Sequence, residues 1–183
     1  MKVEAADNES YQLGMALVDN EDFQNANTYP LWLERMKLGA AVDCLIDDET
    51  FGLTADNPVP VNGQFGQLTY LSRLRTPSGA WFVFHRLGSK GLIDIYEVLS
   101  IDGAHRFEVF LDLYHPRRSR KPIRGFTLDE RPNVWTGSPM TVPNFPEGLL
   151  SDLARHSDGV GLGYARPSQV KPAIDKLIGI LDA

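Results

Sequence analysis

The sequence predicts an α+β protein whose antiparallel meander sheet of four to six strands is covered by helices on one face. Two observations predict this class. Apolar and aromatic runs of strand length alternate with turn residues between about residues 67 and 130, and segments of helical periodicity lie before and after them. Because helices do not alternate with strands along the chain, the pattern favours hairpins packed on helices over parallel βαβ units.

The first 28 residues differ in character from the rest. Residues 1–28 are polar and carry six acidic side chains, so we expect an acidic N-terminal segment with the composition of a mobile arm. Within it, the apolar run Leu13–Val18 is compatible with a short strand. Residues 29–183 are enough for a single α+β domain with its own core.

A helix is expected over about residues 30–46. Pro30 suits the first helical turn, and three leucines recur at heptad spacing, namely Leu31, Leu38 and Leu45. Residues 54–66 are dense in turn-forming residues and are therefore predicted to be a structured loop that leads into the sheet.

Five runs have the composition of strands, and turn residues separate them. The runs are Gln67–Arg75, Ala80–Gly88, Leu92–Ile101, His105–His115 and Gly125–Glu130. The sequence Thr76-Pro77-Ser78-Gly79 favours a type I turn after the first run. Asp102-Gly103 is a strong hairpin signal between the third and fourth runs.

The register of that hairpin decides which side chains meet. We favour the pairing of Ile101 with His105, which stacks aliphatic pairs on one face and sets Asp94 opposite Asp112. A slip by one residue would place Glu97 against Glu108, and two like charges directly opposite each other are unfavourable.

Two helices are predicted near the C-terminus. The segment Pro146–His156 is a short helix after a proline-rich loop. A last helix begins at residue 167 or 168, with apolar residues at helical spacing up to Leu181.

Bulk composition limits the classes of function. Hydrophobic residues make up 43% of the chain, but no apolar run reaches the roughly 20 residues that span a bilayer, so we expect a cytoplasmic protein without membrane contact. Cys44 is the only cysteine, which excludes an intrachain disulfide and a cysteine-based zinc site. The net charge of −6 disfavours nucleic acid as a partner and favours a basic protein.

One tract departs from this acidic background. The stretch Tyr114–Gly125 holds no acid and five cations, namely Arg117, Arg118, Arg120, Lys121 and Arg124. Guanidinium groups fit carboxylates and phosphates, so these cations and Tyr114 are predicted to bind an anionic ligand or an acidic protein surface. In the alternative interpretation, the tract is a solvated turn whose arginines pair with the protein's own acids.

Four residues of the predicted sheet are candidates for acid–base chemistry, namely His85, His115, Asp94 and Asp112. Histidines at adjacent strand ends could form an acid–base pair, and two facing carboxylates could divide into acid and base. The ordinary alternatives are buried histidines bonded to the backbone and solvated aspartates. The histidine spacing matches no metal-binding motif, so no metal site is predicted.

The favoured hypothesis is a non-catalytic cytosolic interaction protein, of the inhibitor, immunity or adaptor kind, that presents its sheet and basic arm to a protein partner. No phosphate-binding loop or nucleophile-elbow motif is present, so no cofactor is predicted. The alternative is a small hydrolase or phosphate-ester enzyme that uses the four sheet residues, with arginines holding an anionic substrate.

Overall fold

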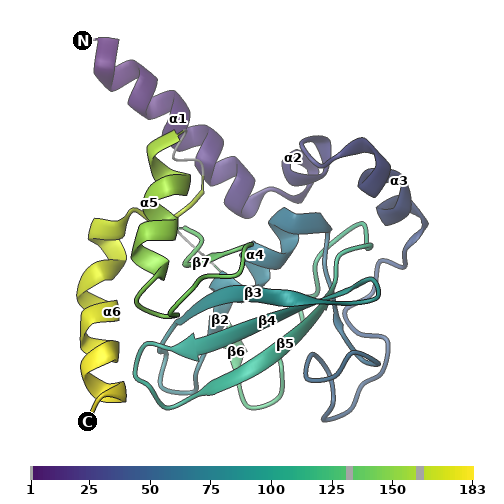
Figure 1. Ribbon diagram of the computed structural model, residues 1–183. Coiled ribbons are helices and arrows are strands. Elements are labelled where there is room, and N and C mark those ends of the chain that lie inside the picture. The colour runs from purple at the N-terminus through teal and green to yellow at the C-terminus, as the bar shows by residue number, and fades with distance from the viewer. Residues whose placement is uncertain (1, 131–133, 160–162) are drawn as a thin grey trace.

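The computed structural model describes residues 2–130, 134–159 and 163–183 and shows an α+β fold (Figure 1). The helices are α1 (Lys2–Asp19), α2 (Glu21–Ala26), α3 (Pro30–Leu38), α4 (Gly63–Arg73), α5 (Leu149–Gly159) and α6 (Pro167–Leu181). The strands are β1 (Val59–Pro60), β2 (Leu74–Arg75), β3 (Phe82–Lys90), β4 (Ile93–Ser100), β5 (Arg106–Asp112), β6 (Thr127–Leu128) and β7 (Gly137–Ser138). The predicted class is therefore correct, and the two C-terminal helices form as expected.

The main sheet is mixed, which corrects the predicted antiparallel meander. Its strand order is β1-β5-β4-β3-β7, with antiparallel pairing among the three long strands and parallel pairing at both edges. At one edge Gly137 pairs with Phe84, and a Cβ on Gly137 would lie 2.4 Å from the Phe84 carbonyl oxygen, so glycine is needed there. The run predicted as a fifth strand forms β6, which pairs with β2 in a separate small sheet.

The hairpin of β4 and β5 turns at Asp102-Gly103 as predicted, but its register is the one that the sequence argument rejected. Glu97 stands opposite Glu108, and Asp94 stands opposite Leu111 and not Asp112. The repulsion is offset because the Glu97 carboxylate accepts hydrogen bonds from Arg106 (2.6 Å) and His85 (2.9 Å), and Glu108 is exposed. This register places four buried residues on one face of the sheet, namely Tyr96, Val98, Val109 and Leu111.

The run Gln67–Arg75, predicted as a strand, is mostly the helix α4. Leu68, Tyr70 and Leu71 are all fully buried, because the sheet packs on one side of α4 and α1 and α2 pack on others. A helix that is buried on most of its sides lacks the polar face that gives helical periodicity, so its sequence was misread as alternating.

The helix α3 ends at Leu38, eight residues earlier than predicted. Gly39 follows it, and a Cβ there would lie 2.0 Å from the Tyr114 carbonyl oxygen, so the chain turns away at a point of close backbone contact. The heptad leucines do not face the core, since Leu31, Leu38 and Leu45 are all exposed, whereas Met36 is fully buried.

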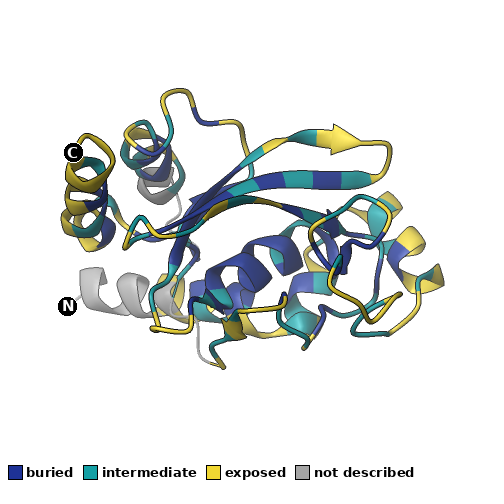
Figure 2. Ribbon diagram, turned by 90° about the horizontal axis from the view of Figure 1, so that it is seen from below, coloured by how far each residue is buried: buried dark blue, intermediate teal, exposed yellow. Residues whose placement is uncertain are grey.

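Helices cover both faces of the sheet, which corrects the prediction of one covered face. Phe82 and Phe84 point into a core with α4, while the intervening Val83 belongs to a second core that contains residues of α5 and α6. Figure 2 shows buried residues concentrated in α4 and in the strands above it, with α5 and α6 at one end of the opposite face. In Figure 1, that end lies opposite α3 and the turn between β3 and β4.

The N-terminal residues are helical, including the run Leu13–Val18 for which a strand was considered. Leu17 and Val18 are buried in the main core, and Gln24 of α2 donates to Thr69 of α4 at 3.0 Å. Among the described residues, no helix is both long and apolar enough to cross a membrane.

Candidate functional site

The cations of the basic tract are paired with acids of the same chain. Arg117 donates to Asp43 at 2.7 Å, Arg120 donates to Glu21 at 2.9 Å, and Lys121 pairs with Asp47. The exposed Arg124 is 4.0 Å from Glu49. The hydrogen bond from Arg117 is the main cause that lowers the pKa of Asp43. The cations thus pair with the protein's own acids, as the alternative interpretation expected, but Arg118 and Ser119 are buried and the tract is not a solvated turn throughout.

Arg118 is the buried member of the tract. Its side chain is 4% exposed and lies 3.3 Å from Glu21 and 3.8 Å from Asp19. Burial, with the neighbouring charge of Arg73, lowers the pKa of Arg118 to about 10. This guanidinium is inaccessible to a ligand in the observed conformation, and it ties the α1–α2 junction to the body of the protein.

His85 anchors a loop to the sheet. The backbone N–H of Val142 donates to His85 Nδ1 at 3.0 Å, so the ring proton lies on Nε2 and is donated to Glu97 at 2.9 Å. The ring of Phe145 stacks on the imidazole with centroids 4.2 Å apart. Both ring nitrogens are thus occupied by structural hydrogen bonds.

His115 and Asp112 form a second, separate pair. The His115 Nε2 atom is 3.2 Å from Asp112 Oδ2, and Nδ1 is 2.7 Å from the carbonyl oxygen of Ala40. Burial lowers the pKa of His115, but the hydrogen bonds to the Asp112 carboxylate and to Ala40 outweigh it, and the pKa is raised. Both nitrogens face acceptors, as a protonated imidazolium requires.

The four predicted acid–base residues do not converge on one centre. His85 is bonded to Glu97, His115 to Asp112, and Asp94 to Arg86. Within the described ranges, no group of three or more His, Cys, Asp or Glu side chains could hold a metal ion.

A cavity of about 350 Å³ lies instead at the end of the molecule formed by α3 and the turn between β3 and β4. The cavity is surrounded by side chains from α3, α4, the β3–β4 hairpin, the end of β5 and the loop after β7. The lining residues are Trp32, Gln64, Gln67, Arg86, Ser89, Gly91, Leu92, Asp94, Tyr96, Leu113, Tyr114, Pro139 and Met140.

The floor of the cavity is a buried polar network. Gln67 donates to Asp94 Oδ2 at 2.9 Å, the Tyr96 hydroxyl donates to Gln67 Oε1 at 3.2 Å, and Arg86 donates to Asp94 Oδ1 at 2.8 Å. Burial, together with the Asp94 charge, raises the pKa of Tyr96, and the hydrogen bond to Asp94 raises the pKa of Arg86. Each side-chain oxygen of Asp94 therefore accepts one hydrogen bond, from Gln67 on one side and from Arg86 on the other.

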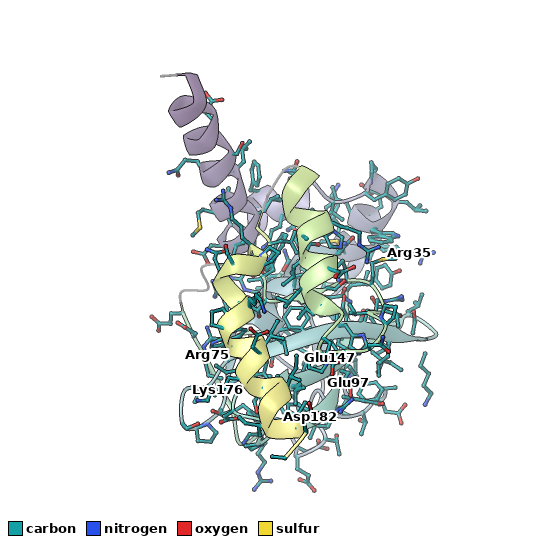
Figure 3. All side chains as sticks on the ribbon, turned by 60° about the vertical axis from the view of Figure 1, so that its left-hand side comes forward. Arg35, Arg75, Glu97, Glu147, Lys176 and Asp182 are labelled. Carbon is teal, nitrogen blue, oxygen red and sulfur yellow. The ribbon has the colours of Figure 1, made fainter. Side chains whose placement is uncertain are left out.

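The rim of the cavity is aromatic and aliphatic. Leu92 and Met140 are 59% and 60% exposed, and Trp32 and Tyr114 line the opening beside them. The Tyr29 ring meets Trp32 edge to face at 6.3 Å, and the Arg35 guanidinium lies 5.5 Å from the Tyr114 ring centre. Figure 3 shows Arg35 at the margin of the molecule, away from α6. We define the pocket face as Tyr29, Trp32, Arg35, Leu92, Tyr114 and Met140.

The sequence identified only part of this site. Asp94 and Tyr114 were candidates, and they line the same cavity. Trp32, Gln67 and Met140 were missed, because they come from segments with no common motif. The one usable signal was Trp32 itself, a large aromatic residue next to the exposed Leu31.

Comparison with protein-family models, with curated proteins and with solved structures finds no match in any of the three.

Proposed function

We propose that the chain is a non-catalytic interaction protein that binds a protein partner through the pocket face. The observation that carries this proposal is the gathering of exposed tyrosine, leucine and methionine side chains around a cavity at one end of the molecule. Exposed apolar patches on a folded chain mark interaction sites, and Trp, Tyr, Met and Arg are the residues enriched in interface cores.

The pairing of the titratable residues supports a non-catalytic role. His85 and His115 each have both ring nitrogens engaged by groups of the protein, and Asp94 has a partner on each carboxylate oxygen. A general acid or base needs a free lone pair or proton directed at the substrate. The hydrolase hypothesis therefore has less support from the geometry, and it serves as the competing outcome of the test below.

In this proposal the basic tract has a structural role and is not the main contact with the partner. With four of its five cations within 3.3 Å of an acid of the same chain, it holds the N-terminal helices and the segment around Asp43 against the body. Contact with a partner falls mainly to the pocket face. The inhibitor, immunity or adaptor role and the cytoplasmic location belong to the same proposal, and the net charge of −6 favours a partner that is basic overall.

The test is affinity capture from the native host with the wild-type chain and two surface variants. The first carries Leu92→Glu and Met140→Glu on the rim of the cavity, and the matched control carries Leu181→Glu at 43% exposure on α6, at the other end of the molecule. We expect a stoichiometric protein with the wild type and the control, and its loss with the rim variant.

Two results would replace the proposal. Retention of the same protein by the rim variant would move the interface away from the pocket face. Hydrolysis of ester or phosphate-monoester substrates by the wild type, abolished by Asp94→Asn or His115→Gln, would establish the enzyme.

A further inference from the structure

The charge around the cavity is positive, in contrast to the chain as a whole. Arg86 and Asp94 neutralise each other at the floor, and Lys37 is paired with Glu34 on α3. Arg35, which lies over the Tyr114 ring, has no ion-pair partner among the residues that the structure describes. Lys90 adds nothing to this charge, because it pairs with Ile93 on the face of the hairpin opposite to the lining residues Ser89 and Asp94. The pocket face therefore has a local cationic surplus that the basic tract, with its paired arginines, lacks.

Arg86 has unused donors at the floor. Its Nη2 atom donates to Asp94 and Ser89, whereas Nε and Nη1 have no hydrogen-bond partner within the described part of the chain. Both two-donor edges of a guanidinium include Nη2, so a further carboxylate would accept a single charge-assisted hydrogen bond from Nη1 or from Nε of Arg86.

The walls favour an apolar group next to that anion. Trp32 and Tyr114 offer aromatic faces, and Met140 offers a flexible thioether that adapts to different shapes. A cavity of about 350 Å³ is at the small end of the roughly 300–1,000 Å³ that ligand sites occupy. It suits one or two side chains of a partner better than an extended cofactor.

We propose that the pocket binds an acidic segment of the protein partner, with a carboxylate at Arg86 and a neighbouring aromatic or large apolar side chain between Trp32, Tyr114 and Met140. The inference rests on the proposed function, because it names what the partner inserts. A basic side chain fits less well, since Asp94 already has two partners and the unpaired Arg35 at the rim is positive.

Three matched dipeptides test the chemistry directly. N-acetyl-Phe-Glu-amide, N-acetyl-Phe-Gln-amide and N-acetyl-Phe-Lys-amide are titrated into the full chain, and the Trp32 indole N–H is followed by NMR. We expect saturable shifts with the Glu probe and binding about tenfold weaker with the Gln probe, which lacks the charge-assisted hydrogen bonds. The Lys probe should bind weakest of the three.

Variants assign the effect to the pocket. Arg86→Gln removes the floor guanidinium, and Arg35→Gln removes an exposed rim charge without touching a buried group. Arg155→Gln, 73% exposed on α5, is the matched control. Both pocket variants should reduce the preference for Glu over Gln, and the control should keep it.

The inference is overturned if the Lys probe binds as tightly as the Glu probe, if no probe shifts Trp32, or if the pocket variants keep the full Glu preference. Its failure is distinct from that of the proposed function. Suppose that a partner is lost with the Leu92→Glu, Met140→Glu variant but binds the Arg86 and rim-charge variants at wild-type affinity. That result would support the proposed interaction protein and refute only the proposal of an acidic segment in the pocket.

Discussion

The ion pairs of the basic tract predict that Glu21 is a stability residue, although it lies in a short N-terminal helix. The Glu21 carboxylate is 3.3 Å from Arg118 Nη1, 2.9 Å from Arg120 Nη2 and 3.1 Å from the backbone nitrogen of Arg118. The change Glu21→Gln removes the charge with little change of shape. It leaves the buried Arg118 guanidinium with Asp19 as its nearest acid, at 3.8 Å.

The size of the effect follows from the burial of the two partners. Removing one partner of a buried ion pair costs about 3–5 kcal/mol, because the other charge stays desolvated. Since the Glu21 side chain is 19% exposed and Asp19 compensates in part, we expect a loss of about 2–3 kcal/mol in the free energy of unfolding. At about 2–4 °C per kcal/mol for a chain of this size, Tm should fall by about 5–10 °C.

Asp22 provides a matched control in the same helical turn. Both acids lie at the N-terminus of α2 and interact with the helix dipole, but Asp22 is exposed and has no ion pair among the described residues. The assay is equilibrium urea unfolding of the wild type and of the Glu21→Gln and Asp22→Asn variants. If the two variants lie within about 0.5 kcal/mol of each other, the Arg118 pair does not stabilise the fold and the reasoning is refuted.

Three further predictions concern other parts of the fold. Because the pKa of His115 is raised by folding, its protonation stabilises the folded state fully below the ordinary pKa of 6.5, and this stabilisation is lost as pH rises through the raised value. Above pH 6.5, the free energy of unfolding measured in urea should therefore fall more steeply with pH in the wild type than in His115→Gln. Equal slopes with pH would contradict the prediction. Gly137→Ala should destabilise the protein by about 2–3 kcal/mol, because its Cβ would collide with Phe84 at the edge of the sheet, and an unchanged Tm would show that the edge strand can move away. Leu38→Glu should change stability by less than about 0.5 kcal/mol, since Leu38 is 88% exposed, whereas a large loss would mean that the side chain is covered.

Local signals in the sequence were enough for the long strands and the last helix. Asp102-Gly103 specified the hairpin turn, with Gly103 at φ 73°, and the apolar spacing of α6 buried Val170, Ile174 and Leu177. The two-residue edge strands carried no periodicity that could be read. The hairpin register could not be derived from its own two strands, because one of the hydrogen bonds that make it tolerable comes from His85 on a third strand.

The candidate site was harder to predict because it combines distant segments. Tyr114 was selected for the basic tract beside it, yet it lines a cavity with Trp32 and Met140, which stand 82 residues before and 26 residues after it. The arginines attracted attention because they are close in sequence. Their partners at residues 19–21 and 43–49 are also acidic runs, but only the fold shows that these oppositely charged runs meet.

The late position of the basic tract has a consequence for how the protein is made. The acids that form ion pairs with the tract lie between Asp19 and Glu49. They leave the ribosome well before Arg124, which follows Glu49 by about 75 residues. At a synthesis rate of about 5–20 residues per second, roughly 4–15 s pass between the synthesis of Glu49 and that of Arg124. The same delay applies to β1, which pairs with β5 about 50 residues later. The N-terminal third of the chain therefore docks onto the body late during synthesis, and a ribosome stalled before residue 117 would carry an acidic, undocked N-terminal segment.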